Sequence, residues 1–530
     1  MDCTFTQLPY GDTGFFSQVA TAYATSDSKL QPFYKHPVSI EGIAAAINSR
    51  KQFKTDRQLI VGELQKQYGS VQVHEKVNQN INLLLNDNSF VICTAHQPAI
   101  FTGSLFFVYK ILHAVKLAEH LSTHFPGNNF VPVFYMGCED ADLDELGNIT
   151  LDGEKINWDT NQSGAIGRMN TKGLDKIINR IEGELSVQPY GKKLVQLLRE
   201  CYPEKTDIQT ATFKLLNALF GEYGLVVLIP DNANLKRKMI PVFEDELFNQ
   251  QSSEIVRRSI ARLSEDFKVQ AQPRDINLFY LKDNIRERIE RSGDTWSIVN
   301  TNITFSADEI RKELNDHPER FSPNVILRGL FQETILPGVA FIGGGGEIAY
   351  WLELKGVFEK YNVPYPVLVL RNSFLVLEKK WKESLDKLRI PVTGIFKDEL
   401  VLLNDLVKRE SVNQLSLTGE ITHVNSYYDK MKSVAEQIDE TLTTHVAALQ
   451  TRAIKPLQEL EKKLLRAERR KFEVQQRQLS ALKKALFPNN GLQERVENFM
   501  PFYAKWGDDF FKMIYRYSLT LEQEFRILTC

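Results

Sequence analysis

The chain reads FVICTAHQPAIFTGS over residues 90–104, where an apolar run passes directly into a polar loop. Residues 90–94 predict a short buried strand. A helical pattern of apolar residues follows from about Ser104 to His124. A strand, a loop and a helix in that order form the repeating unit of a parallel α/β sheet, so this stretch decides the fold class.

Four further apolar runs lie outward from this stretch. They are Phe130–Tyr135, Leu225–Ile229, Ala340–Ile342 and Pro366–Leu370. Helical patterns at about Ile208–Tyr223 and Glu347–Tyr361 lie between them. Strands that alternate with helices predict a doubly wound parallel sheet, here a Rossmann-like core with long insertions. Such a sheet binds its ligands beyond the carboxyl ends of its strands.

A different pattern begins at about Phe374, where helical signals dominate. Apolar residues recur at steps of three and four in Tyr427, Met431, Val434, Ile438 and Leu442, and again, beyond a break near Pro456, in Leu457, Leu460, Leu464, Leu479, Leu482 and Leu486. This spacing predicts two long helices paired as an antiparallel α-helical coiled-coil arm. Proline, glycine and strand-like pieces between Arg389 and Thr422 predict a small insert in this hairpin.

The length of the chain, 530 residues, is too great for one compact core. We expect residues 1–375 to form the Rossmann-like core with its insertions. Residues 376–487 should form the coiled-coil hairpin with its insert, and residues 488–530 a C-terminal segment that packs back on the core. Hydrophobic residues make up 43% of the chain and charged residues 25%, as in an ordinary globular protein.

The charge and the apolar runs exclude several classes of protein. A net charge of -2 gives no positive field of the kind that drives nucleic-acid binding. The apolar runs fall well short of the roughly 20 residues that cross a bilayer, and no secretory signal is visible. Five cysteines, an odd number, show no disulfide framework or zinc spacing. We therefore expect a protein of the reducing cytoplasm, without nucleic-acid or membrane partners.

The loop after the first strand carries groups suited to an anion. It holds His96, Gln97, Thr102, Gly103 and Ser104 directly before a predicted helix. Backbone N–H groups at a helix start attract anions, and glycine lets a ligand approach the backbone closely. His96 could donate to a phosphate or carboxylate, or act as an acid or base. The alternative is a plain helix cap made by Thr102 or Ser104.

The loop after the second strand is acidic. Five carboxylates lie within seven residues: Glu139, Asp140, Asp142, Asp144 and Glu145. Such crowding costs electrostatic energy unless a cation or solvent compensates it. Mg²⁺, the ammonium group of a substrate or a neighbouring arginine could supply the positive charge, and Asp140 is the first candidate to bind it. The alternative is a solvated loop that caps a helix near Leu143.

The third loop is rich in glycine. Gly343, Gly344, Gly345 and Gly346, followed by Glu347, lie between a strand and a helix, which suits a loop that binds phosphate or carboxylate. No Lys-Ser/Thr pair follows, so the run is not a Walker loop. Flexible turns also use glycine. Because all three loops follow strands of one parallel sheet, we predict that they converge on one cleft.

Cationic side chains in the same part of the chain could face a carboxylate ligand. They are Arg328, Lys355 and Arg371. Arg371 directly follows the last predicted strand, where a guanidinium can bind a carboxylate through two hydrogen bonds. A structural salt bridge is the alternative for each of them.

Four stretches of the chain, in this order, resemble the bacillithiol biosynthesis cysteine-adding enzymes. The first two are His96-Gln97-Pro98 to Gly103 with Tyr109-Lys110-Ile111, and Glu139-Asp140 with Asp142, Asp144 and Glu145. The third is Gln332–Pro337 with Gly346–Trp351, and the fourth is Leu464–Glu468 with Leu492–Phe499. The matches run from about residue 90 to the C-terminus.

The resemblance implies a core similar to class I synthetases and nucleotidyltransferases, and a homodimer formed through the coiled coil. It also implies a cysteine ligase, which joins the cysteine carboxylate to the amine of glucosaminyl malate. An amine and a carboxylate do not condense unaided in water. ATP or another nucleotide, with Mg²⁺, is therefore a candidate to activate the acid.

These expectations define a set of candidate site residues. The candidates for catalysis are Asp140, Asp142 and His96. The candidates for substrate or nucleotide binding are Gln97, Thr102, Gly103, Ser104, Glu139, Gly344, Gly345, Gly346, Glu347 and Arg371. We assign no set of metal ligands from the protein.

Two other functions stay open at this point. One is a nucleotidyltransferase-like enzyme that acts on another small acceptor. The other is a non-enzymatic scaffold in which the coiled coil is the functional part. The net charge and the polar loops at the strand ends count against the scaffold.

Overall fold

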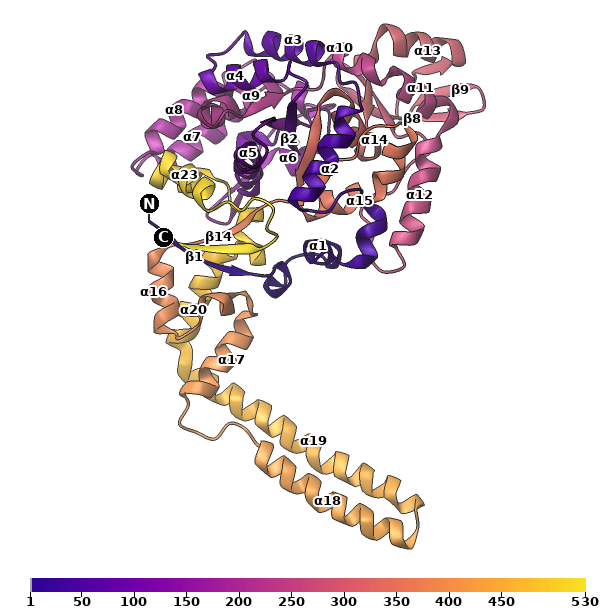
Figure 1. The fold of residues 1–530 in the computed structure, drawn as a ribbon. Coiled ribbons are helices and arrows are strands. Elements are labelled where there is room, and N and C mark those ends of the chain that lie inside the picture. Colours follow the sequence, from indigo (N-terminus) through magenta and orange to yellow (C-terminus); the bar gives the residue numbers. More distant parts are fainter. Residues whose placement is uncertain (1) are drawn as a thin grey trace. The chain divides into compact units, whose positions relative to one another are not determined.

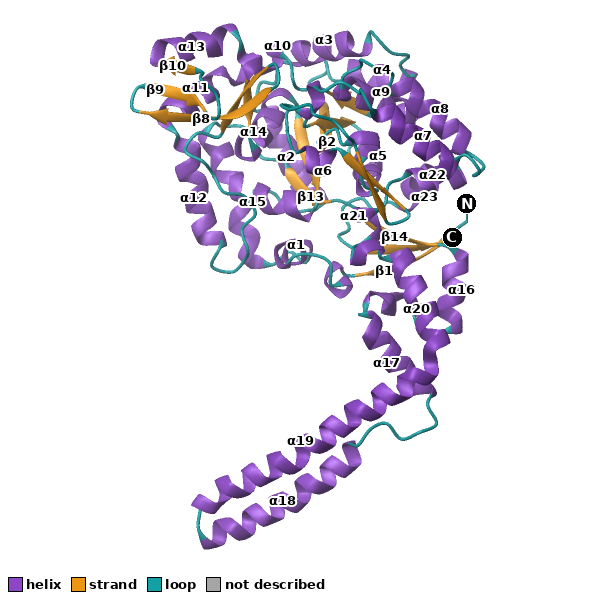
Figure 2. Ribbon diagram, turned by 180° about the vertical axis from the view of Figure 1, so that it is seen from behind, coloured by secondary structure: helices purple, strands orange, loops and turns teal. Residues whose placement is uncertain are grey.

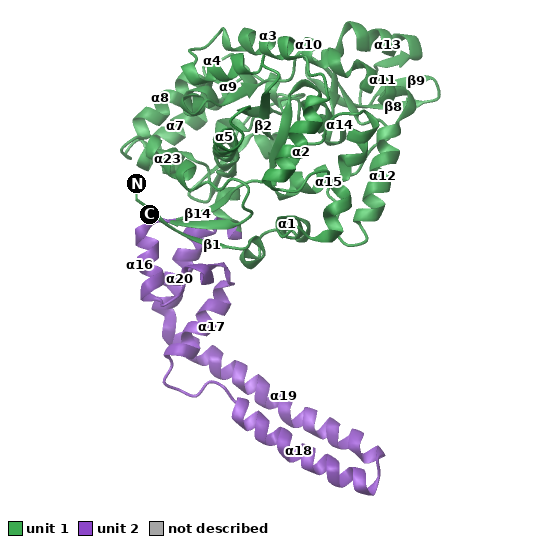
Figure 3. Ribbon diagram, in the orientation of Figure 1, with its two compact units in different colours: residues 1–376, 491–528 green, residues 377–490, 529–530 purple. Residues whose placement is uncertain are grey.

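The computed structural model describes residues 2–530. The chain divides into two compact units (Figure 3). Unit 1 is Met1–Val376 with Gly491–Leu528, and unit 2 is Leu377–Asn490 with Thr529–Cys530. Unit 1 thus contains the expected core together with most of the expected C-terminal segment, and unit 2 corresponds to the expected hairpin.

The centre of unit 1 is a five-stranded sheet in which all neighbouring strands are parallel. Its strands are β2 (Ser89–His96), β3 (Asn129–Met136), β6 (Val226–Leu228), β12 (Gly338–Gly343) and β13 (Val367–Leu370). Each overlaps one of the five apolar runs. A strand buried on both faces needs apolar side chains at successive positions, and such runs are easy to recognise. The prediction of a Rossmann-like parallel core is confirmed.

The strand order, β13-β12-β2-β3-β6, shows where the chain reverses direction in the sheet. From β2 the chain adds β3 and β6 on one side, and it later adds β12 and β13 on the other. This is the order of the first five strands of a Rossmann fold. Ligands of such sheets bind beyond the carboxyl ends of the strands where the order reverses, which here are β2 and β12.

Two helices share one core with this sheet. α2 (Ile40–Lys51) packs on β12 and β13, and α5 (Phe106–His124) packs on β2 and β3 (Figure 1). The apolar core between them includes Ile43, Ile47, Phe90, Ile92, Ala114, Leu117, Leu121, Ala340, Ile342, Val367 and Val369. This packing fixes the start of α5 beside the carboxyl end of β2.

The residues between β3 and β6 form the first insertion. It begins with the short helix α6 (Leu143–Leu146) and the hairpin β4 (Asn148–Leu151) and β5 (Glu154–Asn157). The helices α7 (Leu174–Leu185), α8 (Gly191–Cys201) and α9 (Ile208–Phe220) follow. α9 packs against β6 and so returns the chain to the sheet.

The second insertion lies between β6 and β12 and contains a sheet that the sequence analysis did not predict. Its antiparallel strands, in the order β10-β9-β8-β7-β11, are β10 (Thr304–Ser306), β9 (Thr295–Ile298), β8 (Ile285–Ser292), β7 (Leu278–Lys282) and β11 (Phe321–Pro323). They lie beside α11 (Ile240–Asn249) and α13 (Ala307–Asp316) (Figure 2). The strands are short and β8 is mostly charged, so no apolar run marks them.

The remaining elements of unit 1 complete the layers around the sheet. The helices are α1 (Gln18–Ala24), α3 (Arg57–Tyr68), α4 (Glu75–Leu83), α10 (Ala233–Lys236), α12 (Gln251–Leu263), α14 (Val325–Ile335), α15 (Gly345–Lys360), α21 (Gln493–Val496), α22 (Met500–Trp506) and α23 (Asp508–Tyr517). A small sheet has the order β1 (Thr4–Leu8), β15 (Phe525–Thr529) and β14 (Ser373–Leu377). This small sheet brings together segments from both ends of the chain.

Unit 2 consists of five α-helices with short connections. They are α16 (Lys379–Lys387), α17 (Glu399–Glu410), α18 (Thr418–Ile438), α19 (Thr441–Arg469) and α20 (Glu473–Leu486). α18 and α19 pack along each other as the antiparallel arm. α17 packs on α19 and α20, and Leu402 and Leu406 of α17 and Leu482 of α20 are buried. The prediction of a coiled-coil arm is confirmed.

Two details of the arm differ from the prediction. The second helix begins at Thr441, and Pro456 lies inside it rather than at a break. Contacts with α18 hold the helix on both sides of this proline: Gln450 donates to Asn425 at 2.8 Å, and the Leu417 N–H donates to Glu461 at 3.1 Å. The region between Arg389 and Thr422 forms the helix α17 and no strand.

Within residues 2–530, none of the helices combines the length and the apolar character needed to cross a bilayer.

Candidate functional site

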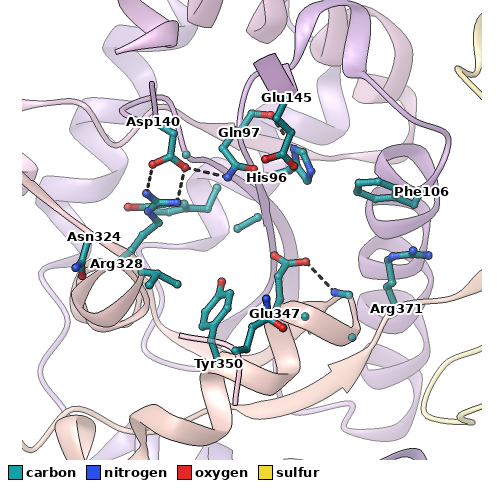
Figure 4. A pocket seen from close by; sticks show the side chains of 18 of the residues that line it. His96, Gln97, Phe106, Asp140, Glu145, Asn324, Arg328, Glu347, Tyr350 and Arg371 are labelled. Carbon is teal, nitrogen blue, oxygen red and sulfur yellow. Dashed lines mark hydrogen bonds and ion pairs between the residues drawn. The ribbon is translucent and has the colours of Figure 1, made fainter. Parts of the chain in front are cut away.

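A cavity of about 760 Å³ lies in unit 1 at the point where the strand order reverses. Its wall contains Ala95, His96 and Gln97 from the end of β2, Asp140 and Glu145 from the acidic loop, and Gly344, Gly345, Gly346 and Glu347 from the glycine loop. The prediction that the three loops meet at one cleft is confirmed. Figure 4 shows His96, Gln97, Asp140, Glu145 and Glu347 around the cavity.

Asp140 is bound by three side chains of the protein itself. Arg328 donates to both of its carboxylate oxygens, with an N–O distance of 2.9 Å to Oδ2. Gln97 donates to Oδ2 at 2.9 Å (Figure 4), and Arg286 donates to Oδ1 at 3.0 Å. Burial alone would raise the pKa of Asp140, but the arginine charges and these hydrogen bonds lower it below its ordinary value. Asp140 is therefore ionised and fixes two arginines at the cavity.

Glu139 points away from the cavity into a buried network of charges. Its carboxylate forms an ion pair with Lys236, whose side chain is fully buried. Next to them, Asp231 accepts two hydrogen bonds of 2.7 Å from Arg168. Burial raises the pKa of Glu139, and the positive charge of Lys236 opposes this shift. The expected sources of positive charge were Mg²⁺, a substrate ammonium or a neighbouring arginine; at Glu139 a lysine of the protein supplies it instead.

Asp142 lies outside the cavity, at the start of α6. Its exposed side chain accepts a hydrogen bond of 3.1 Å from the Glu145 N–H and caps the helix. The structure therefore shows the alternative that was weighed for this loop. Glu145 does line the cavity, and partial burial followed by the charge of Asp142 raises its pKa.

The glycine loop is held by a lysine from α5. Lys110 is fully buried, and its Nζ lies 2.6 Å from Oε2 of Glu347 and also donates to the Ala95 carbonyl. The same Glu347 oxygen accepts the Gly344 N–H at 2.8 Å, which caps α15. Burial lowers the pKa of Lys110, and the Glu347 charge opposes this shift. This cluster ties the ends of β2 and β12 to each other.

The glycine loop leaves open space in the cavity. α15 begins at Gly345, so Gly345 and Gly346 form its first turn, where backbone N–H groups point out of the helix. A Cβ atom on Gly344 would lie 3.5 Å from Arg371 Nε, and one on Gly346 would lie 3.9 Å from Gln270. Both would fit without a clash. These two glycines therefore keep side chains out of the space where a ligand would approach the helix start.

His96 is a neutral ring with a defined tautomer. Its Nδ1 lies 2.9 Å from the Gln97 carbonyl. A carbonyl can only accept, so Nδ1 carries the hydrogen and Nε2 carries the lone pair. Burial, followed by the charge of Lys110, lowers the pKa of His96 to about 4. At neutral pH the ring is therefore uncharged, with its lone pair on Nε2.

The turn before α5 does not reach the cavity. Phe101, Thr102 and Gly103 all have positive φ, at 49°, 70° and 62°. Thr102 is buried, and the hydroxyl of Ser104 donates to the Arg495 carbonyl at 3.0 Å. Neither hydroxyl caps α5, whose N-cap residue is Leu105. Thr102, Gly103 and Ser104 shape the loop instead of lining the cavity.

Arg371 lines the cavity and is also part of a buried ion pair. Its NH2 lies 2.8 Å from Oε1 of Glu494, and its NH1 donates to the Asn372 carbonyl and the Ser373 hydroxyl, each at 3.0 Å. Its guanidinium lies 4.9 Å from the centre of the Phe106 ring. Lys355 is placed elsewhere and donates to the Pro32 carbonyl.

Comparison with known proteins identifies the family of the chain. The family model described as "Bacillithiol biosynthesis BshC, N-terminal Rossmann-like domain" matches residues 1–372. The model described as "Bacillithiol biosynthesis BshC, C-terminal coiled-coil domain" matches residues 374–530. The chain belongs to the BshC family.

Relatives of this BshC-family chain match it over nearly its whole length. A protein from Flavobacterium johnsoniae, named "Putative cysteine ligase BshC", is 37% identical over 98% of this chain and 99% of its own. Proteins of the same name from Flavobacterium psychrophilum and Cytophaga hutchinsonii are 37% and 38% identical, over 96% and 93% of this chain and 96% and 92% of their own.

A solved structure also matches, but too weakly to indicate a shared fold. It is described as a "putative arginyl T-RNA synthetase" from Campylobacter jejuni and is 10% identical over 81% of this chain and 99% of its own, with a TM-score of 0.21.

The cavity of this BshC-family chain is rich in arginine. Five line it, namely Arg274, Arg286, Arg328, Arg371 and Arg495, against three carboxylates, Asp140, Glu145 and Glu347. Asn324, Tyr350, Gln270 and Gln272 add neutral polar groups. The excess of positive charge favours ligands that carry several negative charges.

The sequence analysis missed most of these arginines. Arg286 is on β8, in the sheet that was not predicted, and Arg274 lies in the loop before β7. Arg495 belongs to α21, about 400 residues along the chain from the first loop. Only the match of Leu492–Phe499 to the family could have pointed to Arg495. Among residues 2–530 no group of three or more acidic, histidine or cysteine side chains is placed to hold a metal ion.

Proposed function

We propose that this chain is a cysteine ligase of bacillithiol biosynthesis in the cytoplasm, which joins the carboxylate of cysteine to the amine of glucosaminyl malate. The observation that carries the proposal is an arginine-rich cavity at the reversal point of the sheet. It lies in a chain whose relatives, similar over nearly their full length, are named as cysteine ligases. The product bond is an amide between the cysteine carbonyl carbon and the glucosamine nitrogen.

The arginines suit the malate part of this substrate. Malate carries two carboxylates, and guanidinium groups bind carboxylates through paired hydrogen bonds. Arg286 and Arg328 are already aligned by Asp140, so their donors are ordered before a ligand arrives. Arg274 and Asn324 lie in the same wall. We assign the malate carboxylates to this side of the cavity.

His96 suits the proton transfer that amide formation requires. The attacking amine must lose a proton as its nitrogen bonds to the acyl carbon, and a neutral imidazole can take that proton. The fixed tautomer of His96 leaves Nε2 to accept it, and its low pKa keeps the ring neutral. We therefore assign His96 as the base and Asp140 as the residue that orients the arginines.

The cysteine carboxylate needs a leaving group before the amine can attack it. We assign this activation to ATP or another nucleotide with Mg²⁺, which would form an acyl adenylate and release pyrophosphate, or form an acyl phosphate and release the nucleoside diphosphate. The start of α15 with Gly344–Gly346, beside Arg371, suits the phosphate groups, because the first-turn N–H groups and the guanidinium donate to anions. The amine then displaces the nucleotide or phosphate.

The proposed reaction can be tested directly. The purified chain is incubated with cysteine and glucosaminyl malate, with and without ATP and Mg²⁺, and the products are identified by mass spectrometry. We expect the complete mixture to contain the condensed product, whose mass equals the sum of the two substrates less one water. The proposal would be overturned if no product formed with any nucleotide and the chain bound neither cysteine nor glucosaminyl malate.

We also propose that the arm joins two copies of the chain. Tyr427, Met431, Val434 and Ile438 form one stripe along α18 and remain 43–75% exposed, and Leu442 on α19 remains 42% exposed. An apolar stripe of this length on a monomer favours a second surface that covers it, and a symmetric pair of identical arms supplies one.

Light scattering at micromolar concentration tests this assembly. We expect a dimer for the natural chain and a monomer for the Met431→Glu, Ile438→Glu double variant, which places charges on the stripe. A natural chain that is monomeric throughout this concentration range would overturn the assignment.

A further inference from the structure

A short segment of unit 1 supports residues at the wall of the cavity. Residues Leu492–Asn498, which we call the brace, follow directly after the end of unit 2. The family resemblance includes this segment but assigns no role to it. Its side chains Gln493, Glu494, Glu497 and Asn498 are polar and nevertheless buried. Buried polar groups in a connecting segment need a specific structural or functional reason.

Glu494 orients one of the cavity arginines. Its fully buried carboxylate accepts from Arg371 at 2.8 Å and from the Phe374 N–H at 3.1 Å. The bond from NH2 of Arg371 to Glu494 and the bonds from NH1 to Asn372 and Ser373 hold both terminal nitrogens of the guanidinium away from the cavity. The Nε edge is then the edge that lies beside Gly344. Glu494 thus decides which N–H group of Arg371 a ligand meets.

Asn498 holds the turn that leads into α5. Its amide nitrogen donates to the Phe101 carbonyl at 3.0 Å and also to the Gly103 carbonyl. Non-glycine residues with positive φ are strained, and such a conformation persists only where the surroundings enforce it. The Glu497 carbonyl accepts the Leu105 N–H at 2.7 Å, which extends this support to the start of α5.

We propose that Glu494 is a positioning residue, which sets the direction of Arg371 before an anionic ligand binds, while Asn498 fixes the course of the 101–105 turn. Arg495, between them, lines the cavity itself. The brace therefore supplies one side chain of the cavity wall, Arg495, and the support of another, Arg371. This inference rests on the proposed function for the identity of the substrate used to test it.

The chain offers a matched control for Glu494. Arg50 and Glu333 form another ion pair that is almost fully buried, with an N–O distance of 2.5 Å, and neither residue lines the cavity. Glu494→Gln and Glu333→Gln each remove one buried negative charge from an arginine. If burial alone matters, both variants lose stability and bind ligands alike. If Glu494 positions Arg371, only Glu494→Gln loses affinity.

The test measures the dissociation constant for ATP with Mg²⁺ by calorimetry, and thermal unfolding, for each variant, because the phosphate groups are assigned to the glycine loop beside Arg371. We expect Glu494→Gln to bind about 10- to 100-fold more weakly, the range typical of groups that orient a binding residue, and Glu333→Gln to bind as the natural chain does. Arg371→Ala and the double variant Arg371→Ala, Glu494→Gln should then have equal affinities, since Glu494 acts through Arg371. Unchanged affinity of Glu494→Gln, or additive losses in the double variant, would overturn the inference.

A second variant and a second ligand keep the role of Glu494 testable if the first experiment fails. If Glu494→Gln does not fold, Glu494→Asp is used instead, which keeps the charge but moves the carboxylate away from Arg371. We then expect a smaller loss of affinity. If the natural chain does not bind ATP with Mg²⁺, the proposed nucleotide is wrong. The same variants titrated with pyrophosphate then still test the brace, because the arginine edge that Glu494 presents should bind that anion too.

Discussion

The acidic loop after β3 and the glycine loop after β12 border the same cavity, and they contribute to it in opposite ways. In the acidic loop, Asp140 is bound by arginines, Glu139 by Lys236 and Asp142 by its own helix. In the glycine loop, Gly344 and Gly346 add no side chain and leave the helix start accessible. A dense group of charges in a sequence therefore need not mark a ligand, whereas a run without side chains can mark the space that a ligand fills.

The largest effect should come from breaking the network around Asp140. Asp140→Asn leaves Arg286 and Arg328 without their shared carboxylate, so we expect product formation to fall by about 100-fold or more, as for misplaced binding groups. Removing one partner of a buried ion pair also costs roughly 3 kcal/mol of unfolding free energy. Relief of repulsion among the acids would instead leave stability unchanged or raise it. Product assays and denaturant unfolding separate these outcomes.

His96, at the end of β2 between the two loops, should show the next largest effect. His96→Gln removes the proposed base, so we expect kcat to fall on the order of 100-fold, with little change in KM. A variant that changed KM alone would assign His96 to binding. Steady-state kinetics measure both constants.

The same histidine should also affect the pH dependence of stability. Its pKa is about 4 in the folded chain, below the ordinary value of 6.5. The unfolded chain therefore binds more protons between these values, and stability falls as pH drops from about 6.5 toward 4. In His96→Gln this decline should be shallower. His113, whose pKa is also lowered to about 4, is present in both proteins and contributes equally. Unfolding curves across this range give the comparison.

A moderate effect should follow from filling the glycine loop. Gly346→Leu places a side chain in the cavity without a backbone penalty, because Gly346 does not have a positive φ. We expect the affinity for the nucleotide to fall about tenfold, equal to about 1.4 kcal/mol of binding free energy. The melting temperature should stay constant or rise, since leucine favours a helix more than glycine does. Normal affinity in this variant would mean that ligands bind elsewhere in the cavity.

The smallest effect should come from Asp142, which sharpens the contrast within the acidic loop. Asp142→Ala removes a helix cap and should cost about 1 kcal/mol of unfolding free energy. Turnover should match the natural chain, because the side chain lies outside the cavity. A strong loss of turnover at normal stability would restore Asp142 as a catalytic residue.

The central sheet could be predicted because burial on both faces leaves a local signal. Phe90–Thr94 and Pro366–Leu370 are apolar at successive positions, and the strands β2 and β13 follow them closely. The convergence of the three loops follows from the parallel sheet alone. In the arm, the periodicity identified the helices, but the rule that proline ends a helix failed at Pro456, where α18 supports α19 from the side.

The partners within the site could not be predicted in this way. Asp140 is bound by residues 146 and 188 positions away, and Glu494 meets Arg371 across 123 positions. No periodicity or composition encodes which arginine meets which carboxylate over such separations. Arg286 also lies on a charged strand, β8, which gives no apolar signal. The acidic loop was therefore recognised as important while its actual partners remained hidden.

The position of the brace after unit 2 has a consequence for synthesis of the chain on the ribosome. Domains generally fold in order as they emerge, at about 5–20 residues per second. Here the parallel sheet is made early, but Arg495 and its neighbours emerge only after the helices of unit 2. A nascent chain that stops at residue 490 should hold the sheet without a finished cavity. Stalled chains of increasing length, probed by limited proteolysis, should therefore gain protection of the 101–105 turn only after residue 498 has left the exit tunnel.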